Sequence, residues 1–117
     1  KLYYRNDREI KPITNIKIKK IKKTSGWCND PKNQFYNKEI KIKKKVKHEK
    51  LFRRDYKYNY LITIKYNTKK IIPYKGSAIF LHLTKNFKPT AGCIAVKKND
   101  FLVLAKLINK NSKIIIN

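Results

Sequence analysis

The order of hydrophobic and polar residues predicts a mainly β fold, because a period of two recurs along most of the chain. Residues 2–4 are apolar and precede a polar turn at 5–8, and isoleucine then alternates with lysine over 15–19. Alternation returns within 39–50, and residues 60–66 are rich in β-branched and aromatic side chains. Each of these segments is expected to contain a strand, and the lysine-rich ones a strand that is half exposed.

A further apolar run, Ser77–Thr84, predicts a mostly buried strand. With a period of two, His82 lies late on this strand, near a loop over Lys85–Ala91. The segment Cys93–Val96 is expected to form another short strand. In that arrangement the loop returns Cys93 to the neighbourhood of His82.

Near the end of the chain the period changes, and Asn99–Asn109 is predicted to be a helix. Apolar residues recur at i, i+3, i+4 and i+7, as Phe101, Leu104, Ala105 and Ile108. Asn99 suits the N-cap, and Asp100 suits the positive end of the helix dipole. The apolar face is expected to pack on a sheet. Lys113–Ile116 is interpreted as a closing strand, and Gly26–Pro31 as a turn.

The length of 117 residues predicts one domain, 1–117, with one modest core. No apolar run approaches the roughly 20 residues of a membrane span, so no integral membrane span is expected. The chain begins at Lys1 without an apolar signal segment, and an upstream portion is expected to be missing. Two cysteines and two histidines lack the spacing of metal ligands, so neither a metal nor another cofactor is expected.

The charge balance is extreme, with 31 Lys and Arg against 7 Asp and Glu and a formal net charge of +24. Such a field attracts polyanions without specificity. Lysine, isoleucine, asparagine and tyrosine all have codons rich in A and T, however, so drift in an AT-rich genome explains the same composition. Both explanations stay open, and charge alone assigns no function.

Cys93 and His82 are the candidates for covalent chemistry. A cysteine with a pKa of about 8.5 is largely protonated at neutral pH and needs a neighbouring base or cation to attack as a thiolate. Gly92 lets the backbone approach a substrate closely, and Thr90 and Ala91 are small. From spacing alone, a cysteine packed in the core is the stronger interpretation. A disulfide between the two cysteines is a further alternative and would abolish the nucleophile.

Several motifs in combination resemble the L,D-transpeptidase catalytic-domain (YkuD-like) family. They are GSAIFLH at 76–82 and PTAGCIAV at 89–96, followed by the helix near Asp100. The resemblance is to the branch that carries TAGC where better-known members carry Ser-His-Gly-Cys. YYRNDR at 3–8 and GWCNDP at 26–31 resemble two further family blocks. The strand that usually precedes the first of these blocks is absent here.

Residues 48–58 resemble the family pattern His-Glu-x-Leu-x-Arg-x-Asp-x-x-Tyr. The matching positions are His48, Glu49, Leu51, Arg53, Asp55 and Tyr58. Arg53 and Asp55 fit a structural ion pair as well as a binding site for a substrate carboxylate. His48 fits a surface histidine as well as an imidazole supplied to the site. Trp27 fits a buried anchor as well as a residue of the donor-binding cleft.

The resemblance implies a bent sheet or β-sandwich with one helix packed on it, in the C-terminal half. It also implies a cysteine acyltransferase of bacterial peptidoglycan, located in the cell envelope or periplasm. Carried onto this sequence, the Cys93 thiolate attacks a stem-peptide carbonyl and His82 is the general base. Backbone N–H groups of Gly92 and Cys93 form the oxyanion hole. The residues expected to bind substrate are Trp27, His48, Arg53, Asp55, Tyr58 and Thr90.

Two departures from the better-known signature leave the reaction open. Ala91 stands where that signature has its second histidine, and Ala95 stands where it has an arginine. Either His48 or Arg53 supplies the missing group, or the reaction differs from cross-linking. The alternatives are a stem-peptide hydrolase with the same Cys/His pair, a basic nucleic-acid-binding domain and an inactive fragment. Nucleic-acid binding leaves the Gly-Cys after a histidine-bearing strand unexplained, so no specific nucleic acid is expected.

Overall fold

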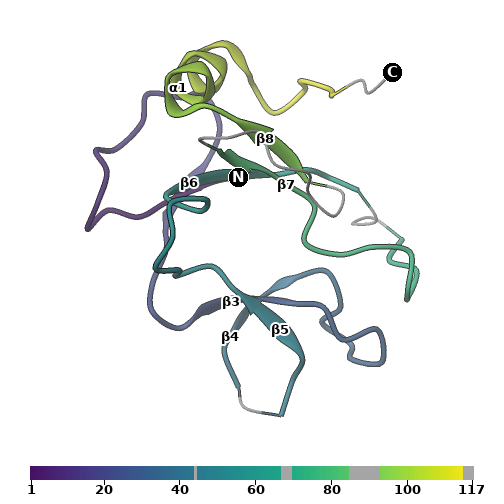
Figure 1. The fold of residues 1–117 in the computed structure, drawn as a ribbon. Helices are drawn as coiled ribbons and strands as arrows, with labels where there is room; N and C mark the ends of the chain where they lie inside the picture. The colour runs from purple at the N-terminus through teal and green to yellow at the C-terminus, as the bar shows by residue number, and fades with distance from the viewer. Residues whose placement is uncertain (44, 67–69, 85–92, 115–117) are drawn as a thin grey trace.

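The computed structural model describes residues 1–43, 45–66, 70–84 and 93–114. In these ranges eight short strands form two sheets, and one helix lies in the C-terminal half (Figure 1). The elements are β1 (Leu2–Tyr4), β2 (Ile18–Lys20), β3 (Ser25–Cys28), β4 (Glu39–Lys41), β5 (His48–Lys50), β6 (Tyr60–Thr63), β7 (Phe80–Leu83), β8 (Ile94–Val96) and α1 (Lys98–Leu107). This arrangement confirms the expected mainly β fold, a small sandwich with a single helix.

The larger sheet has the strand order β2-β1-β6-β7-β8. β6 is antiparallel to both of its neighbours, whereas β8 runs parallel to β7 with His82 opposite Ala95. Residues 85–92 connect these two strands and lie outside the described part of the chain, so the predicted loop is not tested. β7 is shorter than the predicted strand, because Ala78 adopts a positive φ of 56° that interrupts extended backbone before Phe80.

Helix α1 covers one face of the larger sheet, as predicted (Figure 1). Phe101 and Ala105 are fully buried, and Asp100 lies in the first turn. The helix begins one residue earlier than predicted, with Lys97 as N-cap and no side-chain cap, so the assignment of Asn99 as N-cap is wrong. Leu104 is 36% exposed rather than buried.

The smaller sheet has the order β4-β3-β5, and its central strand lies in the segment that was interpreted as a turn. Residues 25–28 are all buried and pair with strands on both sides. Gly26 suits this position because Ile42 packs over it, and an added Cβ would lie 2.8 Å from Ile42 Cγ1. The Asn-Asp-Pro turn signal takes effect only after Cys28.

Two hydrophobic cores lie on opposite faces of the larger sheet. The first lies under α1 and includes Leu81 and Leu83, whereas the second lies between the two sheets and includes Phe80. The residues of the second core are Tyr3, Ile21, Trp27, Leu51, Tyr58, Leu61, Ala78 and Phe80, with Phe52 and Cys93 packed against it. The predicted alternation along β7 is therefore confirmed.

The described C-terminal residues do not continue the sheet. Lys113 and Ile114 lie outside any strand, and the rest of the predicted closing strand falls outside the described residues. Over the described ranges, no helix has the length and apolar character needed to cross a membrane.

Candidate active site

Cys93 lies immediately before β8, beside the start of β7. Its thiol donates a hydrogen bond to the carbonyl oxygen of Ala78 at 3.3 Å, and its sulfur accepts one from the N–H of Phe80 at 3.4 Å. The side chain is partly exposed, whereas Cys28 on β3 is fully buried. The two thiols, both in the described part of the chain, are not joined in a disulfide. The disulfide alternative is therefore excluded, and the more accessible sulfur is that of Cys93.

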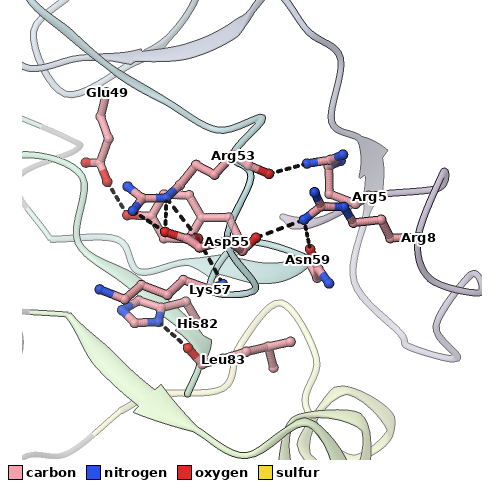
Figure 2. Close-up of polar contacts among 10 residues, drawn as sticks. Arg5, Arg8, Glu49, Arg53, Asp55, Lys57, Asn59, His82 and Leu83 are labelled. Atoms are coloured by element: carbon pink, nitrogen blue, oxygen red, sulfur yellow. Dashed lines mark hydrogen bonds and ion pairs between the residues drawn. The ribbon is translucent and has the colours of Figure 1, made fainter. Parts of the chain in front are cut away.

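His82 is a buried residue of β7 whose ring is oriented by the neighbouring backbone (Figure 2). Its Nδ1 lies 2.9 Å from the carbonyl oxygen of Leu83. Because a carbonyl oxygen only accepts, Nδ1 carries the proton of the neutral ring. Nε2 is then left with its lone pair, which is the state a general base requires.

Strand register relates the two candidate residues. His82 is opposite Ala95, and Cys93 precedes Ala95 by two positions. Residues two apart share a face, so Cys93 and His82 belong to the face that also carries Phe80. Strand rise and spacing separate two such Cα atoms by about 8 Å. A cysteine and a histidine side chain directed toward each other span that distance.

Tyr58 fills the space next to this face. Its ring makes edge contacts with Phe80 and with His82, each at a centroid distance of 5.6 Å. Its hydroxyl donates a hydrogen bond to the carboxylate of Glu49 on β5. Burial, and then this hydrogen bond, raise the pKa of Tyr58 far above its usual range, so the hydroxyl stays protonated.

Arg53 and Asp55 form the ion pair that the sequence allowed as one alternative (Figure 2). Arg53 Nη2 lies 2.5 Å from Asp55 Oδ2, and Nε is 3.1 Å from both carboxylate oxygens. The guanidinium carbon also lies 5.2 Å from the centroid of the Tyr58 ring. The two side chains are 35% and 43% exposed, so this pair lies at the surface beside the tyrosine.

Two arginines that were not predicted to belong to the site, Arg5 and Arg8, donate hydrogen bonds to the backbone of this loop (Figure 2). Arg5 Nη1 donates to the carbonyl of Arg53 at 2.6 Å, and Arg8 Nη1 donates to the carbonyl of Asp55 at 2.9 Å. Both belong to the YYRNDR block, whose resemblance to the family was noted without a role. The sequence contains the block, but it does not predict the contact, because Arg5 and Arg53 are 48 residues apart and such a distant contact leaves no local pattern.

The structure places Trp27 close to the candidate residues and His48 away from them. The ring of Trp27 makes an edge contact with Phe80 at 5.2 Å, and its Nε1 donates to Asn37 Oδ1 at 3.0 Å, as a buried anchor does. His48 pairs with Cys28, whereas Glu49 pairs with Trp27. Successive residues face opposite sides of a sheet, so His48 points away from the second core. Thr90 and Gly92 lie outside the described residues.

Burial has opposite effects on the two candidate groups. It raises the pKa of the Cys93 thiol, an effect partly offset by the N–H of Phe80, and it lowers the pKa of His82. At neutral pH the resting pair is therefore a thiol beside a neutral imidazole, rather than a thiolate beside an imidazolium.

Alkylation of Cys93 by iodoacetamide should show this raised thiol pKa. Only the thiolate reacts, so at pH 7 the folded chain is expected to react more slowly at Cys93 than the same chain in denaturant. The difference should disappear as the pH rises through the pKa of the folded thiol. Mass spectrometry of the Cys93 peptide over pH 6–11 measures it. Full reactivity of the folded chain at pH 6 would instead indicate a stabilised thiolate.

Comparison with known proteins gives one match. The family model of the L,D-transpeptidase catalytic domain, YkuD, matches residues 3–116. Neither the curated proteins nor the solved structures include a match to this chain. The family match covers nearly the whole chain, including β7, β8 and the segment that carries Arg53 and Tyr58. The chain therefore belongs to the L,D-transpeptidase catalytic domain family, whose members act on peptidoglycan.

Proposed function

We propose that this protein is a cysteine acyltransferase of peptidoglycan, with Cys93 as nucleophile and His82 as general base. The observation that carries the proposal is the shared sheet face of the two residues, with the His82 ring held in the tautomer that exposes Nε2. The family match supplies the substrate class.

The first half-reaction acylates the enzyme. His82 Nε2 takes the thiol proton as the sulfur attacks a stem-peptide carbonyl, and the proton then passes to the leaving amine, which departs as D-alanine. Because the resting pair is neutral, the proton moves together with substrate attack. We assign the oxyanion hole to the N–H groups of Cys93 and Gly92. In the second half-reaction an amine takes the acyl group, or water takes it in the hydrolase alternative.

Arg53 is our choice for binding a carboxylate of the stem peptide. Its bonds to Asp55 use Nε and Nη2, so the N–H groups of Nη1 are not used in the ion pair. The pair is partly exposed, and the guanidinium lies over Tyr58, which itself contacts His82. Asp55 orients the guanidinium, while Tyr58, Trp27 and Thr90 complete the substrate-binding side in this proposal.

We place the enzyme in the cell envelope, where peptidoglycan is found. Its net charge of +24 adds a non-specific attraction to polyanions, which include acidic wall polymers. This attraction concentrates the enzyme near its substrate without contributing to the chemistry.

Intact mass after treatment with a carbapenem tests the proposal. We expect one covalent adduct per chain, and peptide mapping should place it on Cys93, because Cys28 is fully buried. An adduct at Cys28, or none at all, would contradict the assignment. Product analysis with a stem-peptide donor, with and without an amine acceptor, then distinguishes transfer from hydrolysis.

A further inference from the structure

Glu49 carries a carboxylate that forms no ion pair within 4.0 Å with any basic side chain that the structure describes, although its charge contributes to raising the pKa of Arg53. The ion pairs within 4.0 Å in the described ranges are Arg5–Asp7, Lys19–Glu39, Arg53–Asp55 and Lys98–Glu9. The chain has 31 basic residues and only 7 acidic ones, so a basic partner was available in abundance. Among the described residues, the side chain that bonds to the Glu49 carboxylate is Tyr58, through its neutral hydroxyl.

The position of Glu49 places this charge beside the candidate nucleophile. Glu49 pairs with Trp27 across β3 and β5, so it shares the sheet face that meets the second core. The ring of Tyr58, whose hydroxyl donates to Glu49, contacts the ring of His82, and Cys93 packs against the same core. The carboxylate is close enough to raise the pKa of both Cys93 and His82, although burial is the largest influence on each pKa.

We propose that Glu49 binds the ammonium group of the acceptor amine in the second half-reaction. This inference rests on the proposed function and extends it by naming the residue that selects an amine over water. A chain with a net charge of +24 repels cationic acceptors, so a cationic substrate needs a local negative group near the acyl-enzyme. Glu49 is half-buried and keeps acceptor capacity beyond the single bond to Tyr58.

The transfer step balances with the residues present. The bound ammonium gives one proton to His82 Nε2, and the resulting amine forms a C–N bond to the thioester carbonyl as the C–S bond breaks. The nitrogen loses a second proton, which ends on the sulfur of Cys93. The imidazolium releases the first proton to solvent. The products are an amide and a thiol, and no further reactant is needed.

The variant Glu49→Gln tests the charge while keeping an oxygen that accepts from Tyr58. The acyl-enzyme is formed from a stem-peptide donor and is discharged by glycinamide, a primary ammonium compound, or by hydroxylamine, which is uncharged at neutral pH. We expect the KM for glycinamide to rise about tenfold relative to the KM for hydroxylamine. Loss of the charge also lowers the pKa of Cys93 and His82, but that change affects both discharge reactions alike. Glu49→Asp should restore most of the glycinamide KM.

Glu39→Gln is the matched control. Glu39 lies on the same face of the same sheet, on the other side of Trp27, and accepts a hydrogen bond from the hydroxyl of Tyr3 at 2.9 Å. It should leave the KM for glycinamide unchanged. Equal losses with glycinamide and hydroxylamine in Glu49→Gln, or no loss with either, would overturn the Glu49 assignment alone. A wild-type chain that forms no acyl-enzyme would overturn the proposed function along with it.

Discussion

Replacing Cys93 by alanine is expected to abolish both donor turnover and the carbapenem adduct. In the proposed mechanism the sulfur is the atom that carries the acyl group, and alanine offers no substitute for it. Removing the nucleophile from an acyl-transfer enzyme lowers kcat by on the order of 10⁶-fold. His82 alone, acting as a base on water, does not recover that loss. Release of D-alanine from a stem-peptide donor measures turnover, and intact mass measures the adduct.

The variant Cys28→Ala is the matched control for that experiment. Cys28 is the other cysteine of the chain. It is fully buried on β3 and lies outside the second core. Its replacement should leave the adduct in place and cost only the stability of one small buried side chain, about 1 kcal/mol. The urea midpoints of both variants show whether each remains folded. Retained labelling in folded Cys93→Ala would remove Cys93 from the mechanism.

Sequence patterning was sufficient to place His82 on β7 and Cys93 next to β8, although β8 begins at Ile94, one residue later than the predicted strand. Ser77–Thr84 contains β7, and its alternation is reliable because each face of this strand belongs to a different core. A slip of one residue would exchange Leu81 and Phe80 between those cores, so the register is strongly constrained. The same constraint puts His82 on the face toward Cys93. The family resemblance then selected this pair over a packed cysteine, which spacing alone did not.

Local signals misled where distant pairing decides the structure. Gly26 and the Asn-Asp-Pro sequence indicate a turn, yet Ser25–Cys28 is a central strand because β4 and β5 pair with it from both sides. Asn99 is a good capping residue, but the N-cap is Lys97, which lies two residues earlier and directly follows β8. The role of Glu49 was missed for a similar reason. The proposed role depends on the contact of Glu49 with Tyr58 and on its position facing the larger sheet, and neither of these follows from a periodic pattern in the sequence.

Replacing Arg5 by alanine is expected to cause the largest loss of stability among the charged residues described. Arg5 is 3% exposed and makes paired bonds of 2.7 Å to Asp7, in addition to its bond to the carbonyl of Arg53. Its guanidinium carbon lies 3.5 Å from the centroid of the Phe52 ring. Asp7 is 49% exposed and regains water, so the loss comes mainly from the buried Arg5 side chain. A hydrogen bond to a charged group contributes about 1.5–3 kcal/mol, and the guanidinium also loses its packing on Phe52, so we expect a loss of about 3 kcal/mol.

For a domain of this size, that loss corresponds to a fall in Tm of roughly 10–20 °C. Arg54→Ala is the control, because Arg54 is an exposed arginine of the same loop and should shift Tm by less than about 2 °C. Arg5→Lys should recover only part of the loss, since an ammonium group does not reproduce the planar fork that binds both oxygens of Asp7. Equal Tm values for Arg5→Ala and Arg54→Ala would contradict the buried role of Arg5.

Because Arg5 donates a hydrogen bond to the carbonyl of Arg53, the folded fraction of Arg5→Ala should also form the carbapenem adduct more slowly. That result would connect the YYRNDR block to the candidate site.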